Sequence, residues 1–114
     1  MSNQTKQSQL FNQLLLQAID DVLTSIGGST KNIIYLCLSN RKGISREQIP
    51  QRIDDFHETL ESILGEKGVM LIEGRILELL EARMKVNCTV KLDGASVGEC
   101  VVFLCQHFEN SDLL

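Results

Sequence analysis

The stretch Gly68–Met84, GVMLIEGRILELLEARM, gives the clearest indication of the fold of this chain. Apolar residues recur in it every three or four positions, which is the spacing of one face of an α-helix. The members of this face are Val69, Ile72, Ile76, Leu79 and Leu80, and Met70, Leu77 and Met84 widen it to about half of the circumference. The polar residues Glu73, Arg75, Glu78, Glu81 and Arg83 have the spacing of a solvated strip. A helix with so wide an apolar arc needs neighbours on two sides, so we expect it at the centre of the domain.

Two helices are predicted at the start of the chain. The first runs from residue 9 to 26 and ends at Gly27-Gly28, because a glycine pair stops a helix readily. The second runs from residue 31 to 40, with Ser29 or Thr30 as its N-cap and Gly43 beyond its C-terminus. A strand is the alternative for the second segment, since its centre, IIYLCL, is a continuous β-rich run.

A third helix is predicted between this region and the central one. Ser45 and Gln48 form a capping box that opens a short turn, and Pro50 prevents that turn from continuing smoothly. We therefore expect the helix to begin with Pro50 at its first position and to run to residue 64. Gly65 ends it, and a tight link, Gly65–Gly68, leads into the central helix.

The hydrophobic period changes after the central helix. Residues 86–92 alternate between apolar and polar side chains, the pattern of a half-buried strand, and Asp93-Gly94 follows as a turn. Residues 97–108 follow a capping box and place their apolar members on one helical face, which favours a helix over a second strand. The predicted fold class is mainly α: a compact bundle of about five helices with one short β-strand, or strand pair, near the C-terminus. Residues 1–8 are expected to be a disordered tail, and residues 9–110 a single helical domain.

Composition places the chain among ordinary globular proteins. It has 114 residues, of which 43% are hydrophobic and 23% charged, and a formal net charge of −4. No apolar run approaches the ~20 residues that span a bilayer, and the polar start MSNQTKQSQ contains no secretory signal. A cytoplasmic location, no membrane contact and reduced cysteines are the expectations.

The charges are unevenly distributed along the chain. Residues 31–52 contain five basic residues against one acidic residue, whereas residues 54–81 contain eight acidic against two basic. The candidate basic patch consists of Lys31, Arg41, Lys42, Arg46 and Arg52. A helix, a turn with Gly43 and a following helix also have the layout of a helix-turn-helix DNA-binding unit. The would-be recognition helix is acidic, however, and would repel phosphates, so nucleic-acid binding is not favoured.

No constellation of residues predicts catalysis, a metal or a cofactor. Asp54, His57, Glu58 and Glu61 have the helical spacing of metal ligands, but the central helix supplies no second histidine. The four cysteines, Cys37, Cys88, Cys100 and Cys105, form no C-x-x-C motif and are predicted to be small buried thiols. We expect a protein that is not an enzyme.

Two features predict a protein contact. Leu16 and Leu23 lie outside the apolar stripe of the first helix, so either they pack on a second neighbour or they are exposed and available to a partner. The predicted strand has no evident local partner, and an unpaired strand edge favours association. The candidate interface residues are Leu16, Leu23, Val86, Cys88, Val90 and Leu92. A homodimer with two-fold symmetry is the expected assembly.

Three segments resemble a known family. They are AIDDVLTSIGGSTKNIIYLCL, IPQRIDDFHETLESILGEKG and LIEGRILELLEARM, within residues 18–84, and the tail GECVVFLCQHF is similar to the family's last helix. Ile49-Pro50-x-Arg52-Ile53-x-Asp55-Phe56 is the most distinctive portion. The family is the Nitrosopumilus output domains, small archaeal domains of unknown biochemical function. The cysteines and the step Glu73-Gly74-Arg75 depart from its pattern.

The resemblance implies a role and no site residues. Members of the family occur alone or attached to signalling modules, which implies an output or interaction role without assigned catalysis. We therefore expect a non-enzymatic signalling or regulatory output module that acts through protein–protein contacts as a homodimer. A helix-turn-helix-like DNA-binding regulator and a small-ligand sensor with a pocket between its helices are the alternatives.

Overall fold

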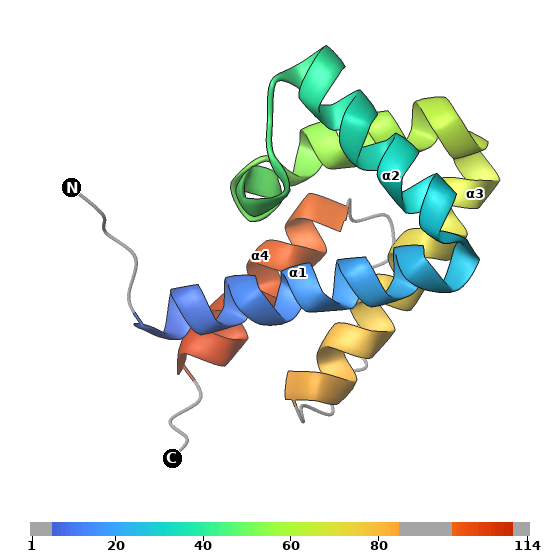
Figure 1. Cartoon of the computed structure of the whole chain (residues 1–114). Coiled ribbons are helices and arrows are strands. Elements are labelled where there is room, and N and C mark those ends of the chain that lie inside the picture. The colour runs from blue at the N-terminus through green and yellow to red at the C-terminus, as the bar shows by residue number, and fades with distance from the viewer. Residues whose placement is uncertain (1–5, 85–96, 111–114) are drawn as a thin grey trace.

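The computed structural model describes residues 6–84 and 97–110, and these residues are mainly helical (Figure 1). The elements are α1 (Lys6–Ile26), α2 (Gly28–Cys37), the π-helical turn η1 (Leu38–Lys42), the 3₁₀ helix η2 (Arg46–Gln51), α3 (Ile53–Met84) and α4 (Val97–Asn110). The described part of the chain contains no strand, and the predicted strand at residues 86–92 lies outside it. The prediction of a mainly helical fold is confirmed.

Helix α1 lies along the centre of the molecule and contacts α2, α3, α4 and η2 (Figure 1). Its inner face is completely buried at Phe11, Leu15, Ile19 and Leu23. The helix begins at Lys6, three residues before the predicted start at residue 9. It ends at Ile26, as the glycine pair predicted.

A single glycine separates α1 from α2. Gly27 has a φ of 138°, which the residue type allows without steric cost, and α2 begins at once with Gly28. The prediction of Ser29 or Thr30 as N-cap was wrong, because the helix has already begun when the chain reaches them. The helical prediction for this segment was correct, and Ile34 and Leu38 are its buried residues.

Helix α3 begins later than predicted. The capping box is present, with the backbone N–H of Ser45 donating to Gln48 Oε1 at 2.9 Å. Pro50 lies within η2 and does not open α3. Arg52 has the non-helical dihedrals φ −130° and ψ 44°, so α3 starts at Ile53.

One residue divides α3 into two arms. Gly65 has φ 80° and ψ 171°, and helical geometry resumes directly after it. The predicted four-residue link between two helices is therefore a one-residue kink. In Figure 1 the first arm (green) lies beside α2, and the second arm (yellow) passes behind α1.

The second arm contains the apolar stretch Gly68–Met84. Val69, Ile72, Ile76 and Leu80 are buried, as predicted, and they form a stripe that belongs to the common core. Met70 was expected to widen this surface, but it is 67% exposed. The apolar face is therefore narrower than half of the circumference, and the second arm has an outer side in contact with solvent.

Candidate functional site

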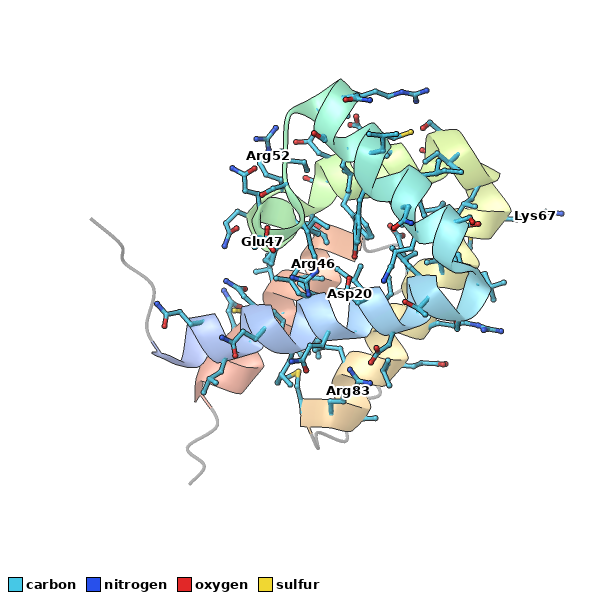
Figure 2. The ribbon with its side chains drawn as sticks, in the orientation of Figure 1. Asp20, Arg46, Glu47, Arg52, Lys67 and Arg83 are labelled. Carbon is cyan, nitrogen blue, oxygen red and sulfur yellow. The ribbon has the colours of Figure 1, made fainter. Side chains whose placement is uncertain are left out.

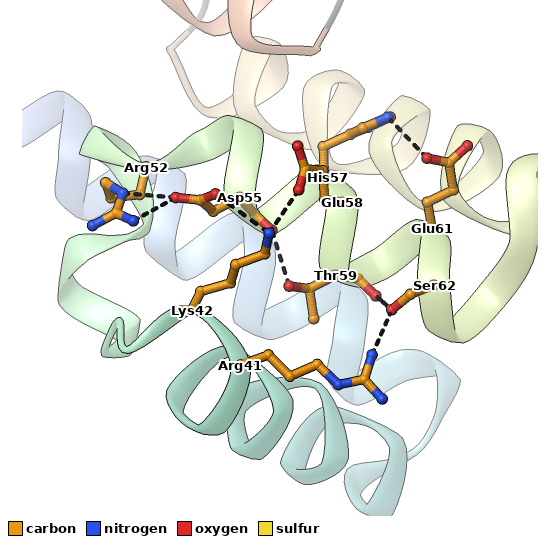
Figure 3. Close-up of polar contacts among 9 residues, drawn as sticks. All are labelled: Arg41, Lys42, Arg52, Asp55, His57, Glu58, Thr59, Glu61 and Ser62. Atoms are coloured by element: carbon orange, nitrogen blue, oxygen red, sulfur yellow. Dashed lines mark hydrogen bonds and ion pairs between the residues drawn. The ribbon is translucent and has the colours of Figure 1, made fainter.

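The first candidate site is the predicted basic patch, and most of it is held by acidic side chains of the same chain. Lys42 Nζ lies 2.6 Å from Glu58 Oε1 and 3.7 Å from Asp55 Oδ1. Arg52 contacts the same Asp55 at 2.7 Å. Figure 3 shows these two cations reaching towards Asp55 from opposite sides, with Arg41 directed to Ser62 further along α3.

Arg46 belongs to a second, partly buried network. Its guanidinium donates to Asp20 Oδ2 from Nε at 2.9 Å and from Nη2 at 2.5 Å, in the space between η2 and α1 (Figure 2). The hydroxyl of Tyr35 also donates to Asp20, so three elements are joined at one carboxylate. Burial by itself would raise the pKa of Asp20, but the hydrogen bonds from Arg46 and Tyr35 hold that pKa below its ordinary value.

The fifth member of the patch, Lys31, acts on the same carboxylate at longer range. Its positive charge also favours the ionised form of Asp20. The basic segment is thus folded against Asp20 and the acidic first arm of α3. Little uncompensated positive charge is left for phosphates, so the structure gives the helix-turn-helix interpretation no support.

A histidine–glutamate pair joins the two arms of α3. His57 Nδ1 lies 2.6 Å from Glu73 Oε2, and His57 Nε2 lies 3.9 Å from Glu61 Oε1. Glu73 was predicted to belong to a solvated strip, but it is only 8% exposed. Burial raises the pKa of Glu73, and the hydrogen bond with His57 offsets part of that increase. The helical period of the second arm alone contained no signal for this burial, because the covering surface belongs to other parts of the chain.

The two leucines proposed for an interface belong to the core. Leu16 is 8% exposed and Leu23 is completely buried. They lie off the main stripe because α1 is covered on more than one side, so the prediction that they form an exposed contact was wrong. The other candidate interface residues, Val86, Cys88, Val90 and Leu92, lie outside the described residues.

Large apolar side chains are exposed elsewhere, at positions that were not predicted to form an interface. On α2 they are Ile33 and Leu36, and on the second arm of α3 they are Met70 and Leu71. Each of these four side chains is more than half exposed. A reading of α2 as an amphipathic helix could have found Ile33 and Leu36, since they lie opposite the buried Ile34 and Leu38 at helical spacing.

Open grooves are also present among the described residues. One, of about 410 Å³, lies between the start of α3 and α4 and is lined by Ile53, Asp54, Val102 and Gln106 among others. The other, of about 420 Å³, lies between the end of α1 and the second arm of α3. Both are wide open to solvent, whereas small-ligand sites enclose most of the ligand's surface. They favour the ligand-sensor alternative only weakly.

The described cysteines and carboxylates form no metal site. Cys37, Cys100 and Cys105 are half-buried cysteines. Within residues 6–84 and 97–110, no group of three or more histidine, cysteine, aspartate and glutamate side chains is arranged to hold a metal ion. Cys88 lies outside these ranges.

Comparison with known proteins adds no assignment. No family model matches the chain, and neither the curated proteins nor the solved structures contain a match to it. Among the described helices, none is sufficiently long and apolar to cross a membrane.

Proposed function

We propose that this chain is a cytoplasmic, non-enzymatic signalling or regulatory output module that acts through protein–protein contacts as a homodimer. The proposal is based on the exposure of Ile33 and Leu36 on α2 and of Met70 and Leu71 on α3. Exposed apolar side chains gathered on a helix face favour a protein contact over a solvated surface.

The polar side chains support the same function because they already bind one another within the chain. Arg46, Tyr35 and Asp20 join α1, α2 and η2, while His57 and Glu73 join the two arms of α3. In each case the polar groups satisfy one another within the chain. The resemblance to the Nitrosopumilus output domains, which implies an output or interaction role, is consistent with this proposal.

Sedimentation equilibrium of the purified chain tests the proposal. Self-association should raise the apparent mass from 12.8 kDa towards twice that value as the concentration increases from ~5 to ~500 μM, the range expected for a small interface. A mass that stays at the monomer value throughout this series would exclude the homodimer.

A further inference from the structure

The outward face of α2 carries no charge. Every exposed residue from position 28 to position 40 is uncharged: Gly28, Ser29, Asn32, Ile33, Leu36, Ser39 and Asn40. The charged residue within this range, Lys31, is half-buried and acts on Asp20 at the inner side. Ile33 and Leu36 lie one helical turn apart at the middle of the face, with small and amide side chains on both sides of them.

The outer surfaces of the other described helices differ from that of α2 in charge or in the number of exposed large apolar side chains. The exposed residues of α3 include charged side chains along both arms, such as Asp54, Glu61, Lys67 and Arg75, and Figure 2 shows Lys67 directed away from the molecule. The start of α1 is also uncharged over Gln9, Gln13 and Gln17, but Leu10 is the single large apolar residue exposed there. Only α2, among the described helices, combines an uncharged outer face with two exposed large apolar side chains one turn apart.

This charge distribution favours a second copy of the chain as the partner. The chain has a formal net charge of −4, so two copies repel one another at most relative orientations. At the outer face of α2, neither copy presents a carboxylate to the other. The centres of protein interfaces are depleted of charged residues, and the α2 face has that composition. Figure 1 shows α2 at the periphery of the described fold, where a second molecule can approach it.

We infer that the outer face of α2 is the contact between two copies of this chain, with the two α2 helices packed antiparallel about a two-fold axis. This inference rests on the proposed homodimer and specifies its surface. In the antiparallel arrangement, Ile33 of one copy packs against Leu36 of the other, and the reverse pair forms by symmetry.

The orientation follows from the residue that comes directly after the face. Arg41 is exposed at the C-terminal end, where its guanidinium donates to Ser62 of α3, and a parallel packing would place the two Arg41 residues at the same end of the contact. The antiparallel packing places them at opposite ends of a face about 18 Å long, beyond the Debye length at physiological salt. A face of seven exposed residues is small for a stable interface, so the dimer should dissociate in the micromolar range.

The experiment compares two charge-matched double variants by sedimentation equilibrium. The first is Ile33→Glu with Leu36→Glu. The second is Met70→Glu with Leu71→Glu, which adds the same two charges to another exposed apolar pair. All four residues are exposed on helices, and far-UV circular dichroism with thermal melting verifies that each variant remains folded.

Dimerisation of the wild type and of the two variants tests the α2 contact. The wild type and the α3 variant should dimerise alike, while the α2 variant should weaken dimerisation at least ~100-fold, since it places four carboxylates in one small contact. If the wild type dimerises and the folded α2 variant does so equally well, the α2 assignment is wrong and the homodimer stands. If only the α3 variant dissociates, the contact lies on α3. A monomeric wild type at ~500 μM would remove both the assignment and the proposed homodimer, given the micromolar affinity expected of a small interface.

Discussion

Asp20 and Asp21 are adjacent on α1 and have very different surroundings. Asp20 receives hydrogen bonds from Arg46 and Tyr35, whereas Asp21 pairs with Arg83 at the surface and its side chain is 56% exposed. Figure 2 shows Asp20 facing Arg46 inside the fold and Arg83 at the far end of α3. The same residue type therefore stabilises the fold to different extents at two neighbouring positions.

Replacing these two aspartates one at a time should separate their contributions. Asp20→Asn should cost about 1–3 kcal/mol at neutral pH, because it weakens charged hydrogen bonds at a partly buried site. Asp21→Asn should cost less than about 1 kcal/mol, as is usual for an exposed ion pair. Urea unfolding monitored by circular dichroism measures both, and equal costs would contradict the assigned difference.

The low pKa of Asp20 gives this cost a pH dependence. A carboxyl group whose pKa is lower in the folded state stabilises the protein above its ordinary pKa, and that stabilisation is lost as the pH falls through the folded-state value. The difference between wild type and Asp20→Asn should therefore shrink when unfolding is measured below about pH 4.

Glu73 should have the opposite pH dependence. Burial raises its pKa, so the folded state retains a proton where the unfolded chain has already released it. Stability consequently falls as the pH rises from the ordinary carboxyl pKa through the raised value, and it does not recover above that value. Glutamine does not titrate, so Glu73→Gln should gain stability relative to the wild type as the pH rises above about 4.

The control for Glu73 lies on the outer side of the same helical arm. Glu78→Gln removes the same charge from an exposed position, and its effect on the urea midpoint should be small at every pH. A difference between wild type and Glu73→Gln that stays constant with pH would show that Glu73 is not buried in the way described.

Within helix α3, Gly65 and Gly74 differ in backbone conformation. A Cβ at either position would meet no atom within 4 Å, so space does not distinguish them. Gly65 has φ 80° and ψ 171°, a region that is essentially restricted to glycine, and Gly74 is helical. Conformation alone should decide the effect of adding a methyl group.

Alanine substitution at these two glycines should have effects of opposite sign. Gly65→Ala should cost about 1–3 kcal/mol, the strain of a side chain at that dihedral pair. Gly74→Ala should stabilise by about 0.5–1 kcal/mol, because it reduces the conformational entropy of the unfolded chain. Thermal melting distinguishes them, and stabilisation by Gly65→Ala would show that α3 is continuous at that point.

The orientation of the second arm of α3 is tested by Ile76 and Glu78. Ile76 is 3% exposed in the core, and Glu78 is exposed. Ile76→Ala should cost about 2–5 kcal/mol through lost burial and the cavity that remains. Glu78→Ala should cost less than about 0.5 kcal/mol. Similar urea midpoints for the two variants would mean that the other face of the arm is buried.

At the scale of the whole molecule, the basic and acidic segments are folded against each other. Lys42, Arg46 and Arg52 are each held by a carboxylate, which leaves the domain without an extended positive surface among its described residues. We expect no shift of a ~30-base-pair duplex by ~10 μM protein at about 150 mM salt, where non-specific binding depends on uncompensated cations. A salt-sensitive shift that disappears in Arg41→Ala would revive the DNA-binding alternative.

The candidate surfaces were harder to predict than the helices because they depend on packing partners. The periodicity of α1 showed which residues are apolar but could not show that Leu16 and Leu23 would be covered as well. The position of each basic residue in sequence was evident, yet the pairing of Lys42 with Glu58 and of Arg46 with Asp20, across 16 and 26 positions, became visible only in the folded chain. Exposure of Ile33 and Leu36 depends in the same way on which side of α2 meets α1 and α3.

Local sequence patterns specify the mainly helical fold, the end of α1 at Ile26, the capping box at Ser45 and the buried row Val69, Ile72, Ile76 and Leu80. These features follow from local periods and backbone preferences, which act over a few residues. Only the tertiary structure decided that Glu73 is buried beside His57 while Met70 is exposed. The kink at Gly65 sets the direction of the second arm, and the helices that meet it determine which residues at the margin of the apolar stripe lose contact with water.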